Sequence, residues 1–525
     1  MKKEISNEQN HIDALDIEKK KVARKKKGRG KIVLFGFFFF LTVAIFSLAI
    51  WYKVTFNVKF NDFLFTLLSP LAGTGVSTVI DVLMFSVLPG MGALIVYWIF
   101  LRLTKDGKPI HLLVRKIGAV TVSVSLVLSL VFGIYALRLP EYLAHYGEKT
   151  LIYDEKYVDP SSVAITDYDG NARNLIYIYL ESFETTYASE EDGGAQKGVN
   201  YMPYLTDLAK DYISFSDGEG LGGFRSVTGT SWTMGALLGT TSGIPFSLEI
   251  FGARGQNKQG GDGSFLNGLT TLGDILADKG YQNSFLIGSD IAFAGTDSYV
   301  TVHGGYDIFD IHTAREKGYI AKNYHNGFWG FEDMYLYQIA KDRLRELSAS
   351  GEPFNFTMMT IDAHHTGGYT CELCSNQYGS RTANVIACCD RQLYEFVKWC
   401  QAQDFYKDTT IVITGDHPRM DNKLVKDVPF YERTIYNCII NAAVDTPVSD
   451  KNRVFTSLDM FPTTLVAIGF EIEGNRLGLG TNLFSALPTL CEEMGEGEVG
   501  YNLFDDEVKK TSDYYKNNFF KKKLT

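Results

Sequence analysis

Three long apolar runs near the start of the chain constrain its fold more than any other sequence feature. They cover residues 32–51, 82–101 and 119–137. A helix rises about 1.5 Å per residue, so roughly 20 apolar residues are enough to cross the hydrocarbon core of a bilayer. The sequence therefore predicts an N-terminal membrane anchor of three transmembrane helices within residues 32–138.

The basic residues predict how this anchor is oriented. The net charge of the chain is -10, yet a dense run of lysine and arginine between Lys19 and Lys31 directly precedes the first apolar run, and the link between the second and third runs is also basic. Because basic flanks stay in the cytoplasm, everything after Arg138 is expected outside the plasma membrane of a multi-pass protein. Nucleic-acid binding is not expected, because the basic run abuts a membrane helix. A cleaved signal peptide is not expected either, because no small-residue cleavage site ends the first run.

Composition predicts the remaining divisions. Residues 1–31 form a basic cytoplasmic tail. Residues 57–80 are apolar but interrupted by polar residues and a proline, which predicts an interfacial or re-entrant stretch on the outer face, with simple anchoring an equal alternative. A linker at residues 139–173 leads to an extracytoplasmic domain at residues 174–490. The charged and aromatic residues 491–525 show no periodicity and are expected to be peripheral or poorly ordered.

From Asn174 the sequence alternates β-rich apolar runs with amphipathic helical patterns. This alternation predicts an α/β domain with a mostly parallel central sheet covered by helices on both faces. The expected strands are residues 175–180, 284–288, 354–361 and 410–414. The expected helices are residues 203–212, 272–279, 332–348, 390–401 and 458–468. The sequence leaves the oligomeric state open.

Four of the seven cysteines lie close together in the sequence: Cys371, Cys374, Cys388 and Cys389. In a cytosolic protein such a group would indicate zinc. Outside the membrane, disulfides that staple a surface loop are the favoured interpretation, although the pairing stays open.

Polar residues directly follow three of the predicted strands. Glu181 follows the first, His364 and His365 follow the third, and Asp416 and His417 follow the fourth. The carboxyl ends of parallel strands meet at one edge of a sheet, where ligands bind. Two carboxylates and an imidazole are suitable ligands for a divalent cation. The sequence therefore predicts a metal site made by Glu181, Asp416 and His417.

Residues 229–238 have the pattern of a turn that enters a helix, and Thr230 lies at this turn. Backbone N–H groups at a helix start favour a phosphate, and a metal-bound threonine hydroxyl loses its proton more easily. Thr230 is therefore predicted to be both the nucleophile and a fourth metal ligand. Simpler roles also exist, since Thr230 and Glu181 can cap helices and the histidines can be exposed loop residues. The joint pattern favours chemistry over these roles.

Four segments also carry a resemblance to a known family. In chain order they read LIYIYLES at 175–182, GTSWT at 229–233, TIDAHH at 360–365 and TGDH at 414–417, with WGFED at 329–333 and RLGLGTNLF at 476–484 in support. Over residues 174–484 the chain resembles the lipoteichoic acid synthase and phosphoglycerol transferase family. The resemblance implies a sulfatase-type, alkaline-phosphatase-like α/β domain on the membrane anchor.

The resemblance also implies site roles. It implies a manganese-type centre made by Glu181, Thr230, Asp416 and His417, for which Mg²⁺ and Zn²⁺ are alternatives. Thr230 would be the nucleophile, and His364 rather than His365 would lie near the substrate phosphate. Sulfatase activity itself is not expected, because sulfatases need a cysteine or serine where Thr230 stands.

The implied reaction moves a glycerophosphate group from phosphatidylglycerol to a hydroxyl of an envelope glycan or glycerophosphate polymer, through a phosphoglyceryl-threonine intermediate. Lipoteichoic acid synthases carry a Trp-x-Arg where residues 293–297 of this chain read FAGTD. The departure disfavours the polymerase branch and favours similarity to the branch that decorates periplasmic glucans. The rival predictions are a phosphoethanolamine transferase and a non-catalytic envelope protein that binds lipid or polymer.

Overall fold

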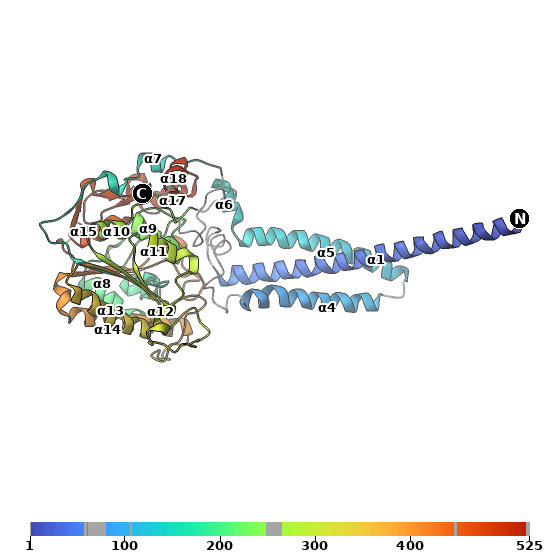
Figure 1. The fold of residues 1–525 in the computed structure, drawn as a ribbon, viewed down its shortest axis with the longest axis horizontal. Helices are drawn as coiled ribbons and strands as arrows, with labels where there is room; N and C mark the ends of the chain where they lie inside the picture. Colours follow the sequence, from blue (N-terminus) through green and yellow to red (C-terminus); the bar gives the residue numbers. More distant parts are fainter. Residues whose placement is uncertain are drawn as a thin grey trace. The chain divides into compact units, whose positions relative to one another are not determined.

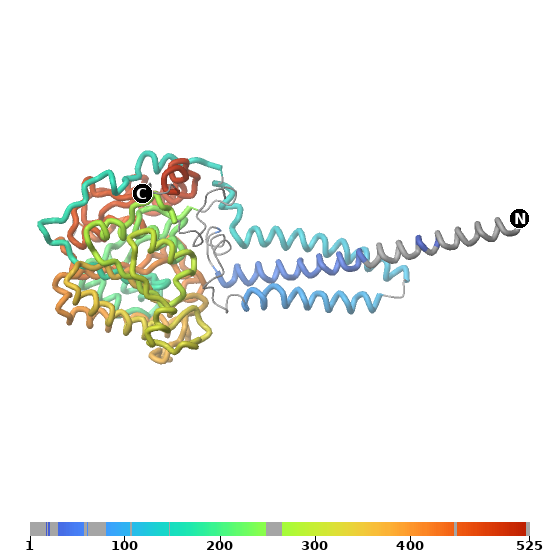
Figure 2. Tube along the Cα trace, viewed as in Figure 1, coloured from blue at the N-terminus to red at the C-terminus, as the bar shows by residue number. Residues whose placement is uncertain are grey.

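The computed structural model describes residues 2–56, 60, 80–104, 108–145, 147–247, 265–445 and 449–520. The chain forms two compact units (Figures 1 and 2). One unit comprises Met1–Thr55 and Ser77–Pro140, and the other comprises Phe56–Val76 and Glu141–Thr525.

The first unit contains α1 (Lys2–Thr55), α4 (Leu88–Leu103) with a π-helical turn before it (Leu83–Val87), and α5 (Pro109–Ala136). The apolar part of α1 runs beside α4 and α5 (Figure 1). Three spans are long and apolar enough to cross a membrane: Gly30–Thr55, Ile80–Leu103 and Pro109–Ala136. The three predicted apolar helices are therefore confirmed. The third helix begins at Pro109, before the predicted apolar run, so its first turns also include basic residues. Proline is favoured at the first position of a helix.

Hydrogen bonds join the elements of this unit, among them two that α1 accepts or donates. The Tyr97 hydroxyl donates to the Ile32 carbonyl at 3.1 Å, and the Ser47 hydroxyl donates to the Phe85 carbonyl at 2.6 Å. Of the predicted interfacial stretch 57–80, only Phe60 and Ile80 lie within the described residues. That prediction otherwise falls outside the part of the chain that the structure describes.

The second unit is built on a six-stranded sheet in the order β4-β3-β5-β2-β6-β7. In chain order these strands are β2 (Asn174–Leu180), β3 (Gln282–Ile287), β4 (Asp307–Phe309), β5 (Phe354–Met359), β6 (Thr409–Gly415) and β7 (Asn437–Ile440). All neighbouring pairs are parallel except β6 and β7, which are antiparallel. The mostly parallel sheet is therefore confirmed, with the four predicted strands at its centre and β4 and β7 added at its edges.

Helices cover both faces of this sheet (Figure 1). One face packs against α8 (Pro203–Asp211), α13 (Asp333–Ser350) and α14 (Arg381–Gln401), and the opposite face against α9 (Thr233–Ser242), α10 (Leu272–Asp278) and α15 (Met460–Ala467). Successive side chains of β2 point to opposite faces of the sheet. Ile176 and Ile178 pack in the core on the α8, α13 and α14 side, whereas the Tyr179 hydroxyl lies 2.7 Å from that of Thr240 in α9 on the other side. Burial on both faces explains why the strands read as continuous apolar runs.

The remaining elements are short. The helices are α6 (Leu139–His145), α7 (Ile152–Glu155), α11 (Thr296–Val302), α12 (Ile311–Glu316), α16 (Leu490–Met494), α17 (Gly497–Lys509) and α18 (Asp513–Asn518). Two small antiparallel pairs join β1 (Ile165–Asp167) to β8 (Phe470–Ile472) and β9 (Arg476–Leu477) to β10 (Gly480–Thr481).

The C-terminal segment was expected to be peripheral or poorly ordered, and residues 497–518 are ordered. It forms α17 and α18, and Tyr501, Phe504 and Tyr515 are buried. The Tyr501 hydroxyl donates to the Ser226 carbonyl at 2.7 Å, so α17 packs against the loop that leads to α9. Local periodicity does not reveal this order, because Tyr501 and Tyr515 contact segments that are distant in the sequence.

We expect Tyr501→Phe to lower the free energy of unfolding by about 1 kcal/mol, because it removes one buried hydrogen bond and keeps the ring. Urea denaturation of the full chain in detergent measures the change. Leu503→Ala is the matched control, since Leu503 lies on the same helix with 48% of its surface exposed. Equal stability of Tyr501→Phe and wild type would contradict a supporting role for this contact.

Candidate metal centre and active site

Glu181, Asp416 and His417 come together at the carboxyl end of the sheet. Glu181 follows β2, and Asp416 and His417 follow its neighbour β6. One potential ligand atom from each residue lies within 4.8 Å of the others. His417 Nε2 is 3.8 Å from Glu181 Oε1 and 3.3 Å from Asp416 Oδ2. The parallel pairing of β2 with β6 therefore creates the three-ligand group that the sequence predicts.

This group brings two carboxyl groups together in the interior. All three side chains are buried, and Asp416 Oδ2 accepts no hydrogen bond from the described residues. Burial, followed by repulsion from Asp416, raises the pKa of Glu181 to about 8, and burial also raises the pKa of Asp416. These two buried carboxyl groups fit a divalent cation. Such an ion would offset their negative charge and bind the Asp416 oxygen that accepts no hydrogen bond.

Neighbouring groups hold the three side chains in place. The Ser182 hydroxyl donates to Glu181 Oε1 at 2.6 Å, and the Ser182 N–H donates to Asp416 Oδ1 at 2.7 Å. Ser182 lies in the left-handed region at φ 55°, a conformation typical of functional turns. His417 Nδ1 lies 2.9 Å from the Pro418 carbonyl, so Nδ1 carries the proton and Nε2 would be the ligand atom for a metal.

The two threonines of the GTSWT segment have different surroundings. Thr230 is 0% exposed, and its hydroxyl donates to the Val227 carbonyl at 3.0 Å. Within the described residues, no hydrogen bond joins Thr230 to the three-residue group. Thr233, the first residue of α9, is only partly buried, and its hydroxyl lies 3.3 Å from His417 Nε2. The structure thus brings Thr233, rather than the predicted Thr230, within hydrogen-bonding distance of the candidate metal group.

The reason for this difference is where the helix begins. The predicted turn continues through Trp232, which is the N-cap, so α9 begins at Thr233 and Thr230 lies in the turn before it. Gly229 holds the turn at φ 95°, where a Cβ atom would meet the Phe246 carbonyl oxygen at 2.5 Å. The free N–H groups and positive dipole end of α9 therefore lie at Thr233.

His364 lies on an aromatic wall beside this group. Its ring stacks on Trp329 at 4.3 Å and on His365 at 4.1 Å, and Phe293 packs edge-on to Trp329. Burial lowers the pKa of His364 well below its ordinary value and that of His365 to about 4. His364 Nδ1 lies 2.9 Å from the His365 carbonyl, so a neutral ring donates through Nδ1 and accepts through Nε2.

Comparison with known proteins identifies the superfamily of this arrangement. The sequence model described as sulfatase matches residues 173–469, more than half of the chain. The chain belongs to the sulfatase family. Its fold is the alkaline-phosphatase-like fold, with the mostly parallel sheet and the ligand group at the carboxyl ends of β2 and β6.

Two relatives of this sulfatase-family chain are named phosphoglycerol transferase I. The protein from Xanthomonas campestris pv. campestris (strain B100) is 29% identical over 372 residues, which cover 68% of this chain and 50% of the relative. The protein from Escherichia coli (strain SMS-3-5 / SECEC) is 29% identical over 319 residues, covering 59% and 39%. The chain thus spans half or less of the length of these relatives.

A solved structure is also similar. The lipoteichoic acid synthase LtaP from Listeria monocytogenes superimposes with a TM-score of 0.46 and 17% identity, covering 63% of this chain and 80% of that chain.

In this sulfatase-family protein, a network of buried charged side chains links the loops around the candidate metal centre. Arg433 donates through Nε to Glu184 at 3.0 Å, and the Arg419 N–H donates to Glu184 at 2.7 Å. Arg419 also makes two hydrogen bonds to Asp421, at 2.7 and 2.8 Å, and one to the Ala363 carbonyl at 2.9 Å. The network therefore ties together the loops that follow β2, β5 and β6, which carry the ligands and His364.

Sequence reasoning missed several of these supporting residues. Asp333 accepts the backbone N–H groups of Ile361 at 2.8 Å and Asp362 at 3.0 Å, and so fixes the start of the loop that carries His364. Asp333 is the last residue of the WGFED segment. The resemblance therefore included this residue but gave it no role. For Glu184 and Arg433 the sequence offers no signal, because the two residues lie far apart in the chain.

Proposed function

We propose that this protein is a metal-dependent phosphoglycerol transferase. It moves a glycerophosphate group from an anionic phospholipid, phosphatidylglycerol, to a hydroxyl of an envelope glycan or polymer outside the plasma membrane. One observation carries the proposal: a threonine hydroxyl at a helix N-terminus lies beside two buried carboxylates and an imidazole. The relatives named phosphoglycerol transferase I support the transferred group.

Thr233 is the proposed nucleophile, in place of Thr230. Thr233 gives up its hydroxyl proton as its oxygen attacks the phosphorus of the lipid phosphodiester, and the bond from phosphorus to the diacylglycerol oxygen breaks. The diacylglycerol oxygen takes up one proton as it leaves, so protons balance in this step. A phosphoglyceryl-threonine results. The free N–H groups in the first turn of α9 are placed to donate to the phosphoryl oxygens, because their partners inside the helix are absent.

The second step returns Thr233 to its starting state. The acceptor hydroxyl attacks the same phosphorus, and the threonine oxygen leaves with a proton. His364 is neutral and has Nε2 as its remaining acceptor, which suits it to take the proton of the incoming hydroxyl. His365 has the less favoured position, since its carbonyl orients His364.

Glu181, Asp416 and His417 would hold the divalent cation, for which we propose Mn²⁺ with Mg²⁺ or Zn²⁺ as alternatives. The ion would lower the pKa of the threonine hydroxyl and offset charge on the phosphoryl oxygens. The membrane helices would hold the domain at the bilayer surface that contains the donor, which raises its local concentration.

A donor assay tests the proposal. We expect the full chain in detergent to release diacylglycerol from phosphatidylglycerol with Mn²⁺, and to stop when a chelator removes the metal. Mass spectrometry of the enzyme incubated with donor alone should find a phosphoglycerol adduct on Thr233. Reaction with phosphatidylethanolamine alone would identify a phosphoethanolamine transferase instead, and binding without cleavage of either lipid would favour a non-catalytic role.

A further inference from the structure

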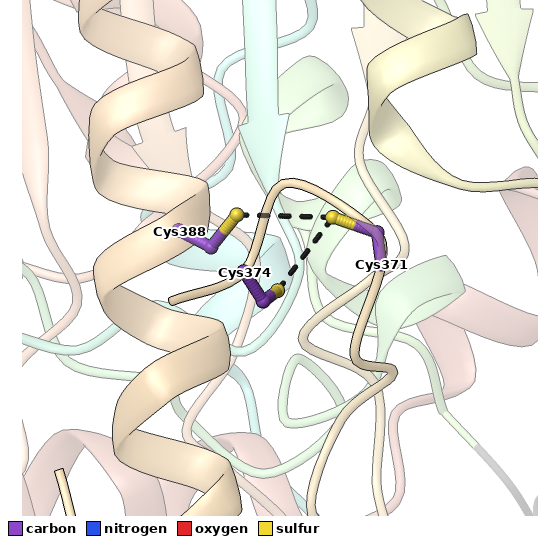
Figure 3. Close-up of side chains that lie close together, drawn as sticks. All are labelled: Cys371, Cys374 and Cys388. Atoms are coloured by element: carbon purple, nitrogen blue, oxygen red, sulfur yellow. Dashed lines mark hydrogen bonds between the residues drawn. The ribbon is translucent and has the colours of Figure 1, made fainter. Parts of the chain in front are cut away.

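Three cysteines form a cluster in the second unit, separate from the candidate metal centre. Cys371 and Cys374 lie in the loop after β5, and Cys388 lies on α14. The sulfur of Cys371 is 3.6 Å from that of Cys374 and 3.8 Å from that of Cys388 (Figure 3). All three sulfurs lie within 4.8 Å of one another, and Figure 3 shows the side chains pointing toward a common point.

These separations are too long for disulfides. A disulfide holds its sulfurs about 2.05 Å apart, whereas all seven cysteines, each in the described part of the chain, are free thiols. The expected disulfide staple is therefore absent from the structure. The separations instead match a tetrahedral metal, because two thiolates about 2.3 Å from a zinc ion lie about 3.8 Å apart.

We propose that Cys371, Cys374 and Cys388 bind a zinc ion through three thiolates, with solvent in the fourth tetrahedral position. Binding releases the three thiol protons to water and involves no change of oxidation state. Sulfur ligands favour zinc, whereas the oxygen-rich group of Glu181 and Asp416 favours harder cations. The chain therefore has two chemically distinct metal sites.

The surroundings of the cluster support thiolates. Gln392 Nε2 donates to the sulfur of Cys388 at 3.3 Å, and the Arg391 guanidinium lies 3.9 Å from the same sulfur. Such donors stabilise negative charge on sulfur and orient the ligands. The Cys374 N–H donates to the Cys371 carbonyl at 3.1 Å, which closes the turn between the first two ligands. Cys374 is only half-buried and leaves a route for the ion to enter.

The location of the site suggests its role. Cys371 lies seven residues after His364, and Cys388 lies on the helix that packs on the sheet beneath. A zinc ion joining them would fasten the loop that carries His364 to α14. The zinc would therefore stabilise the aromatic wall of the active site without contacting the substrate.

Cobalt provides the decisive probe, because Co²⁺ bound by thiolates has near-ultraviolet sulfur-to-metal charge-transfer bands that an oxygen and nitrogen site lacks. We expect the full chain, purified in detergent and freed of metal, to develop these bands on addition of Co²⁺ and to lose them when Zn²⁺ displaces it. Cys371→Ser and Cys374→Ser should each abolish or strongly weaken the bands. Cys389→Ala is the matched control and should keep them, since Cys389 lies in the apolar core.

A second readout covers variants that fail to fold. In the zinc-loaded wild-type protein, the three thiols should resist alkylation until a chelator is added, and chelation should lower the thermal unfolding temperature. Peptide mapping without reductant that finds a disulfide between any two of the three cysteines overturns the proposal. Absence of the cobalt bands, or bands that persist in both serine variants, also overturns it.

Discussion

Thr233→Val should abolish the proposed phosphoglycerol transfer, whereas Thr230→Val should leave most of it. Valine has the shape of threonine and lacks the hydroxyl, so each substitution tests one oxygen. Removing a nucleophile costs roughly 10⁴- to 10⁶-fold in rate. The Thr230 hydroxyl only donates to the Val227 carbonyl, which also accepts the Thr230 N–H at 3.0 Å, so its loss should cost about 1 kcal/mol of stability.

Diacylglycerol release from phosphatidylglycerol measures both variants. Their metal content and unfolding midpoints are measured in parallel, so that loss of activity is not confused with loss of metal or fold. If Thr230→Val is folded but inactive while Thr233→Val is active, Thr230 is the nucleophile. The contact of Thr233 with His417 would then not identify the nucleophile.

Breaking the ion pair of Glu184 and Arg433 should be the most destabilising single change in the chain's polar core. Both side chains are fully buried, and Arg433 donates to Glu184 through two nitrogens. Glu184→Gln would leave the arginine charge buried without its counterion, at a cost of about 3–5 kcal/mol. Because Glu184 also holds the Arg419 backbone, activity should fall together with stability.

Glu346→Gln is the matched control, because 57% of the Glu346 side chain is exposed. Its partner Arg343 keeps a second ion pair, with the exposed Asp307. Its effect should stay within about 0.5 kcal/mol. The double variant Glu184→Met with Arg433→Leu should lose less stability than the two single variants together, as expected for coupled charges. Additive losses, measured by urea denaturation, would show that the pair is not coupled.

The parts of this protein that sequence predicted correctly are those encoded within one segment. The apolar membrane runs, the four central strands and the placement of Glu181, Asp416 and His417 at strand ends follow from local patterns and one topological rule. Edge strands β4 and β7 were not predicted, because three or four residues carry too little periodicity. The start of α14 was also missed, although Ser380 caps it by accepting the Ala383 N–H.

The errors arose where the outcome depended on packing. A turn followed by a helix was evident at residues 229–238, but the choice between Thr230 and Thr233 depended on the residue at which α9 begins. The C-terminal segment lacked periodicity, yet Tyr501 is buried and hydrogen-bonds the loop before that helix. The cysteines suggested either disulfides or a metal, and only the sulfur separations distinguish the two.

The sequence alone determined the membrane helices, the α/β class and the chemical types of the ligands, because hydrophobic periodicity and strand-end positions are local properties of the chain. The tertiary structure decided which threonine meets His417, which cysteines share a point and how buried charges pair. These outcomes depend on angstrom-scale distances between segments far apart in the chain, and such distances are set by the packing of helices on the sheet rather than by the order of residues.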